Sequence, residues 1–161
     1  MSPRTRMPFL GELAAQAGRR RPRVLAWGQG DDAVVACLPD RLACCSAGQW
    51  AFTRWEDVDR GGWDQATGVL RWSGQDAVAH EAVLAQPRDL PEVFRDLVTA
   101  SVVVQQNVAW DGGSAVISLR RNPSGDGSPV QWRVTPAADS DVTTPQAERA
   151  LAQARAEWDI G

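Results

Sequence analysis

The sequence contains no lysine and no tyrosine, and it has a single histidine, His80. A Walker-type phosphate loop needs a Gly-Lys-Ser/Thr step, so the absence of lysine excludes that motif from this chain. Any Ser-His-Asp triad, Cys-His pair or histidine-containing metal site must use His80, because no other imidazole is available. The sequence therefore lacks the residue sets that usually identify an enzyme.

Long apolar runs are also missing: no stretch approaches the length of a signal-peptide core or a transmembrane helix. We therefore expect a cytoplasmic protein with reduced thiols. The net charge of −3 provides no bulk attraction for nucleic acid, so we expect no nucleic-acid partner. Cys37, Cys44 and Cys45 lack C-x-x-C spacing, and we expect buried free thiols with no metal and no cofactor.

Short apolar segments separated by turn residues dominate the chain from Arg23 to residue 85. Residues 49–55 alternate in polarity, which is the period of a β-strand. Segments this short and this closely spaced leave no room for crossover helices, so their sheet must be antiparallel. The predicted strands cover residues 24–27, 33–38, 41–46, 49–55, 69–73 and 77–85, and the edge formed by 49–55 continues through 57–59 toward Gly61 and Gly62.

Two helices are predicted in the second half of the chain. Asp89 and Glu92 have capping-box spacing, and apolar residues then recur at helical intervals, which predicts a helix that ends near Val104. Thr144 and Pro145 predict the start of the last helix, over residues 145–158. Between the helices, strands are predicted over 107–110, 115–121 and 129–135, with a hairpin turn at 111–113.

Residues 1–21 form an N-terminal tail or a short helix. Phe9 and Leu13 can share one side of a helix, although a loosely docked tail is the simpler interpretation. The three cations Arg19, Arg20 and Arg21 allow an alternative, a basic amphipathic anchor for a membrane surface. Glu12 and the short length of the segment disfavour that anchor.

Seven short strands followed by one amphipathic helix, over residues 22–104, resemble the layout of the pleckstrin-homology-like (PH-like) barrel. The stretch Trp55-Glu56-Asp57-Val58-Asp59 with Trp63-Asp64, and then Gly68-Val69-Leu70-Arg71-Trp72, is similar to bacterial versions of that fold. The wider pattern resembles a group of uncharacterised actinobacterial proteins. That second resemblance is carried by Val24-Leu25-Ala26-Trp27-Gly28, Val34-Val35-Ala36, Val98-Thr99-Ala100-Ser101-Val102-Val103 and Arg120-Arg121-Asn122-Pro123.

The resemblance implies an α+β fold in which a helix caps a bent, antiparallel, barrel-like sheet over residues 22–104. Residues 105–161 are then an extension of three strands and a helix, packed on the barrel as part of one globular unit. Lipid-binding members of this fold hold a phosphorylated head group with basic residues in the loop between the first two strands. Here that loop, residues 28–32, is acidic and repels phosphate.

His80 is predicted to pack on the apolar face of its strand, beside Ala82 and Leu84. The alternative is a small enzyme that uses His80 with nearby acids. No nucleophile-elbow sequence and no calcium-loop spacing accompany it, so we predict no catalytic residues.

Eight tryptophans are the most informative residues of the chain. We expect Trp27, Trp72, Trp132 and Trp158 to be mainly structural. Trp55 and Trp63 are flanked by charges, and with Asp59 and Arg60 they form the candidate interaction patch. The competing interpretation is that both tryptophans pack under the second β block. The sequence thus favours a non-enzymatic protein-binding or scaffold module whose partner is another protein, and a homo-oligomer is compatible with it.

Overall fold

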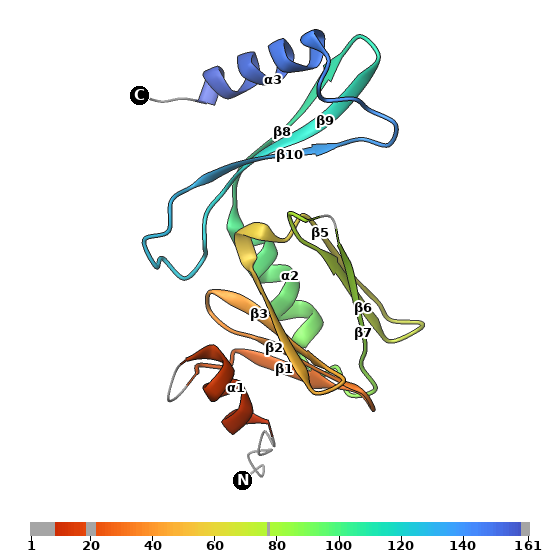
Figure 1. Cartoon of the computed structure of the whole chain (residues 1–161), viewed down its shortest axis with the longest axis vertical. Coiled ribbons are helices and arrows are strands. Elements are labelled where there is room, and N and C mark those ends of the chain that lie inside the picture. The colour runs from red at the N-terminus through yellow and green to blue at the C-terminus, as the bar shows by residue number, and fades with distance from the viewer. Residues whose placement is uncertain (1–8, 19–21, 77, 159–161) are drawn as a thin grey trace.

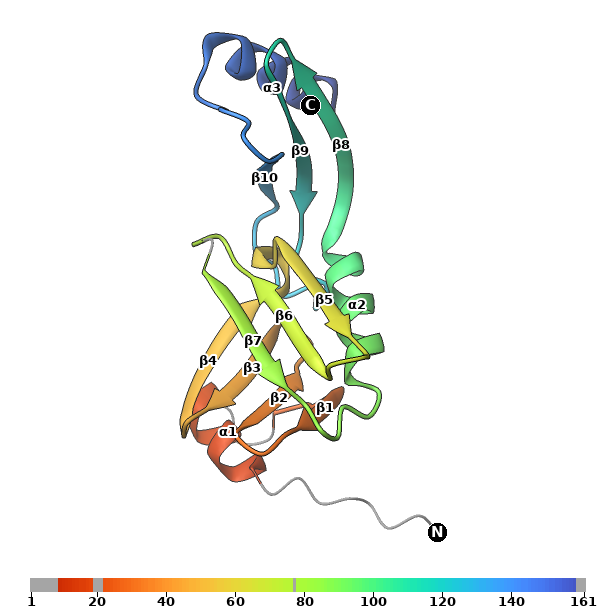
Figure 2. The same cartoon turned by 90° about the vertical axis from the view of Figure 1, so that its right-hand side faces the viewer.

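The computed structural model describes residues 9–18, 22–76 and 78–158. Over these residues the chain is an α+β protein with three antiparallel sheets and three α-helices (Figures 1 and 2). The α+β class is therefore confirmed, but the strands form separate sheets and no closed barrel. The first sheet contains β1 (Ala26–Gln29), β2 (Ala33–Cys37), β3 (Arg41–Ser46) and β4 (Gln49–Arg54), and the second contains β5 (Arg60–Asp64), β6 (Val69–Ser73) and β7 (Ala79–Val83).

Both faces of the first sheet are buried. Val35 and Leu42 point into the main core, whereas Ala36 and Ala43 point to the opposite side and contact α1 (Leu10–Ala17) through a second cluster. This explains why β2 is a continuous apolar run, since a strand with two covered faces needs no polar side. Of the two forms expected for the N-terminal segment, the helix is therefore present over residues 10–17.

The two sheets face each other and join at one corner, where Gln29 pairs with Gln86 in an isolated antiparallel bridge. The short sequence Gly28-Gln29-Gly30 permits this junction, because side chains at its two glycines would collide with the opposite backbone. A Cβ at Gly28 would lie 3.0 Å from the Pro87 carbonyl oxygen, and one at Gly30 only 1.9 Å from that of Val83. The two glycines thus allow the two backbones to approach each other closely at this corner.

The helix α2 (Leu90–Ser101) covers the space between the two sheets, with Leu90 and Phe94 buried in the main core (Figure 1). It ends at Ser101 instead of Val104, because the β-branched residues that follow form a strand. The expected capping box is also absent: Asp89 is the N-cap residue, but its side chain makes no capping hydrogen bond. The backbone carbonyl of Asp89 instead accepts a hydrogen bond from the Val93 N–H at 3.2 Å.

Residues 102–158 form a C-terminal unit with its own core (Figure 2). It stands at one end of the body, which consists of the described residues up to Ser101. Its sheet has the order β10-β9-β8, and Asp111 and Gly112 form the predicted tight turn between β8 and β9. The predicted last helix is confirmed with its cap, since Thr144 Oγ1 accepts a hydrogen bond from the Ala147 N–H at 3.2 Å. The elements are β8 (Val102–Trp110), β9 (Gly113–Arg120), β10 (Gln131–Pro136) and α3 (Pro145–Trp158).

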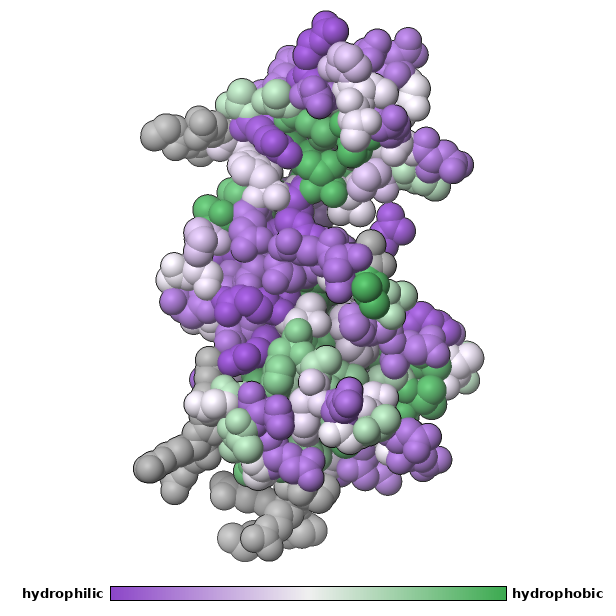
Figure 3. All heavy atoms as spheres, viewed as in Figure 1, coloured by the Kyte–Doolittle hydropathy of each residue, from purple (hydrophilic) through white to green (hydrophobic). Residues whose placement is uncertain are grey.

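Hydrogen bonds and ion pairs attach this unit to the body. Arg120 Nη1 donates to the Val58 carbonyl, and Asn122 Nδ2 donates to the Asp40 carbonyl, both at 2.8 Å. Between these two residues, the backbone N–H of Arg121 donates to the Ser101 carbonyl at 2.8 Å. Figure 3 shows hydrophilic residues forming a band across the middle of the molecule. The stretch 120–123, quoted above for the family resemblance, therefore lies at the junction.

Candidate functional site

Trp55 does not belong to any surface patch, because its side chain is completely buried. It begins a short 3₁₀ turn, η1 (Trp55–Asp57), and its ring packs edge-on against Phe94 with centroids 5.8 Å apart. Its indole N–H donates to the Leu38 carbonyl at 2.8 Å. The strand expected over 49–55 ends at Arg54, so Trp55 lies in the turn that follows. Its burial is in the main core, and not under the second β block as the competing interpretation expected.

The other three residues of the candidate patch lie close together along the chain but have different surroundings. Trp63 is half-buried and packs against the main core. Asp59 forms an ion pair with Arg133 Nη2 of β10. Arg60 is exposed and has no partner among the described residues. Within the candidate interaction patch, only the segment around Arg60 is therefore available as a binding surface.

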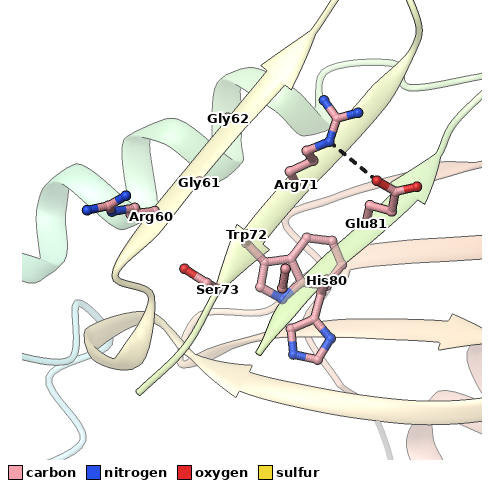
Figure 4. Close-up of a pocket in the computed structure, with 9 residues that line it drawn as sticks. Arg60, Gly61, Gly62, Arg71, Trp72, Ser73, His80 and Glu81 are labelled. Atoms are coloured by element: carbon pink, nitrogen blue, oxygen red, sulfur yellow. Dashed lines mark hydrogen bonds and ion pairs between the residues drawn. The ribbon is translucent and has the colours of Figure 1, made fainter. Parts of the chain in front are cut away.

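A shallow hollow of about 470 Å³ lies at the Arg60 end of the second sheet. Across the three strands, the register aligns Arg60 with Ser73 and then Ala79, and Gly62 with Arg71 and then Glu81. Small residues thus lie among long charged ones, and a side chain at Gly62 would meet nothing within 4 Å. Arg71 and Glu81 close one side with an ion pair of 3.3 Å between Nε and Oε2 (Figure 4).

His80 also lines this hollow, where its ring stacks on Trp72 with centroids 5.4 Å apart and an angle of 15° between planes (Figure 4). Ala82 and Leu84, which were expected to share the apolar face of the strand with His80, are buried. No described side chain makes a hydrogen bond to the imidazole, so nothing orients it as an acid or base. Because His80 borders a hollow, the enzyme hypothesis is not removed and stays a prediction.

A second cavity, of about 370 Å³, lies between the start of β5 and the sheet of the C-terminal unit. Asp59 and Arg60 border it from the body, so two residues of the candidate patch lie at its edge. Amide and hydroxyl side chains from the C-terminal sheet and the buried Arg120 line the rest. No local sequence pattern indicates this cavity, because its residues come from segments about 45–75 positions apart.

Charged groups where the body meets the C-terminal unit form ion pairs. Arg133 contacts Asp57 and Asp59, and Arg54 contacts the buried Glu56 and the loop residue Asp126. Hydrogen bonds from Ser128 and Arg54 hold the pKa of Asp126 well below its usual range. The pKa of Arg54 is raised by its hydrogen bonds to Asp126 and then to Glu56.

The remaining tryptophans follow the prediction with one exception. Trp27 and Trp72 are buried, and Trp132 is half-buried against the core of the C-terminal unit. Trp158 is 42% exposed, which contradicts the structural role expected for it. It lies at the last turn of α3, where its indole N–H donates to Gln106 Oε1 at 2.7 Å.

The cysteines are free thiols, and burial raises the pKa of Cys44 to about 11, with Cys45 adding to the shift. Across the ranges that the structure describes, no group of three or more His, Cys, Asp or Glu side chains is arranged to hold a metal ion. No helix in those same ranges has the length and apolar character needed to cross a membrane.

No family model matches the chain, and the comparison with curated proteins and with solved structures found no match either.

Proposed function

We propose that this chain is a cytoplasmic, non-enzymatic protein-binding or scaffold module with a PH-like architecture, related to the actinobacterial proteins that its sequence resembles. Two features support the architecture: seven strands form two facing antiparallel sheets, and α2 covers the space between them. The expected ligand is another protein.

One observation favours protein binding above the other candidate functions: β5 is an end strand of its sheet and borders the hollow at Arg60. Gly61 and Gly62 are exposed there and carry no side chain to shield the strand edge. An unshielded edge offers backbone N–H and C=O groups to an extended segment of a partner. The hollow beside it provides space and charge for the side chains of that segment.

Affinity purification from the native cell tests this proposal. The variant Gly62→Leu fills the hollow without a clash, and Arg60→Glu reverses its unpaired charge. Gln153→Leu, on the exposed face of α3, adds the same apolar side chain elsewhere. We expect the native protein and Gln153→Leu to recover the same partner, and the two hollow variants to lose it. Identical recovery by all four proteins would contradict the proposal.

The membrane alternative places the anchor at Arg19, Arg20 and Arg21, which lie outside the described residues. Phe9 and Leu13, the apolar side chains expected to face the lipid, are buried against the first sheet instead. Sedimentation with anionic vesicles, with and without residues 1–21, tests this alternative. Binding that depends on residues 1–21 would support it.

A further inference from the structure

Arg120 is a buried cation that forms no ion pair with a carboxylate of the described residues. Its side chain is at the end of β9, and the residue is only 6% exposed. Nε donates to Ser118 Oγ and Nη1 donates to the Val58 carbonyl, each at 2.8 Å. A guanidinium has five N–H donors, so three of them have no partner among the described residues. The nearby carboxylate of Asp59 is already bound by Arg133.

This placement is energetically unfavourable for the protein alone. Removing a cation from water is strongly unfavourable unless an anion accompanies it. Burial is the main reason why the pKa of Arg120 lies below its ordinary value; Asp59 opposes the shift and Arg133 reinforces it. Groups held in this way are concentrated at binding sites, where the ligand supplies the missing charge.

Arg120 borders the 370 Å³ cavity described above, whose volume is within the usual range for small-molecule sites, about 300–1,000 Å³. Strand alternation places its polar lining on the face of the C-terminal sheet opposite to α3. Gln105 and Asn107 are exposed, so the cavity opens to solvent. The hydrogen-bonding side chains of the lining are Gln105, Asn107, Ser114 and Thr135.

We propose that this cavity binds a small organic carboxylate, which pairs with Arg120 and places its polar remainder against Gln105, Asn107 and Thr135. The free donors of Arg120 are on its two terminal nitrogens, which can hold both oxygens of one carboxylate in parallel hydrogen bonds. Asp59 at the edge of the cavity repels a second negative charge, so a monoanion fits better than a phosphate dianion. The amides and hydroxyls favour a ligand that carries hydroxyl groups.

The test is a titration of the full chain followed by backbone amide NMR. The probes are sodium glycerate, which is a carboxylate with two hydroxyls, then sodium acetate, inorganic phosphate and sodium chloride at matched ionic strength. We expect glycerate to shift the amides of residues 105, 107, 120 and 135 with saturation, and to saturate at a lower concentration than acetate. Phosphate and chloride should give no saturating shift.

Asn107→Leu and Ala109→Leu form a matched pair of variants, because both positions are exposed on the same face of β8 and only Asn107 lines the cavity. Neither touches the buried contacts of Arg120. We expect Asn107→Leu to weaken glycerate binding about tenfold, the loss of one good hydrogen bond, and Ala109→Leu to leave it unchanged.

Three results would overturn the proposal: a glycerate response equal to that of chloride, tighter binding of phosphate than of glycerate, or equal binding by the two variants. None of them affects the protein-binding proposal, because Asn107 lies in another sheet and lines the second cavity but not the hollow along β5. The two proposals therefore fail independently.

Discussion

At the scale of single residues, Arg54 connects the body to the loop between β9 and β10. It contacts Glu56 beside it and reaches Asp126 and Ser128 of the loop at 2.5 and 2.7 Å. Asp126 also accepts a hydrogen bond from the Ser128 backbone N–H at 3.0 Å. The ion pair with Arg54 requires the ionised carboxylate, so this attachment of the loop depends on pH.

We predict that acid releases this loop. A carboxyl whose folded pKa is depressed stabilises the fold fully above its ordinary pKa, about 4, and this contribution is lost as pH falls toward the folded value. The urea midpoint of the native protein should therefore fall between about pH 4 and pH 2, and that of Asp126→Asn should fall less steeply. Asp111→Asn is the control, because Asp111 is an exposed turn residue without a partner among the described residues, and asparagine suits the same turn. Equal slopes for both variants would contradict the prediction.

Several buried residues could not be placed from the sequence, and Trp55 shows why. Its neighbours are acidic, and acidic neighbours normally indicate a surface. Glu56 is nevertheless buried as well, because Arg54 compensates its charge. Such compensation depends on the folded structure, and the pattern of neighbouring residues in the sequence does not show it. Trp27 and Trp72 were predictable because their strands pack against other elements throughout.

At the scale of elements, the helix α1 exists because of the sheet beneath it. An eight-residue helix is marginal in isolation, and its N-cap residue Phe9 makes no side-chain capping bond. Leu13 is completely buried on the sheet, and Phe9 packs edge-on against Trp27 with centroids 5.2 Å apart. The sequence indicated a helical face but not the partner for it, so a tail was equally compatible with the pattern.

We predict that Leu13→Ala lowers the free energy of unfolding by about 2–5 kcal/mol, the usual cost of such a truncation in a packed core. Leu10 is the matched control on the same helix, since it is 38% exposed. Leu10→Ala should change the free energy of unfolding by no more than about 0.5 kcal/mol. Urea denaturation of both variants, followed by tryptophan fluorescence, checks this. Equal effects of the two substitutions would show that α1 does not pack as described.

At the scale of the whole molecule, two apolar cores are connected by a polar junction. The run of seven strands and the last helix could be predicted, because each depends on local periodicity and turn residues. The junction could not, because Arg120 and Asn122 belong to a polar segment that has the composition of a solvated loop. Both are buried, and their donors reach backbone carbonyls 62 and 82 positions earlier in the chain.

Asn122 is the residue on which we expect this junction to depend most. Its Nδ2 donates to the Asp40 carbonyl, while its Oδ1 accepts from the backbone N–H and the hydroxyl of Ser124. Asn122→Ala removes all three of these hydrogen bonds, each worth about 1 kcal/mol net, while the Asp40 carbonyl still accepts a longer one from the Trp55 N–H at 3.4 Å. We therefore predict a loss of about 1–3 kcal/mol in the free energy of unfolding. The exposed Asn107 makes no such contacts, and Asn107→Ala is the control for loss of an asparagine amide.

Hydrogen exchange measured by mass spectrometry distinguishes a weakened junction from general destabilisation. In Asn122→Ala we expect protection to fall first in residues 55–59 and 121–130, which meet at the junction. The strands β2 and β3 should keep their protection, because their core lies within the body and includes no residue of the C-terminal unit. A uniform loss of protection in the body and in the C-terminal unit would contradict a polar junction that opens on its own. It would mean that the two parts unfold together.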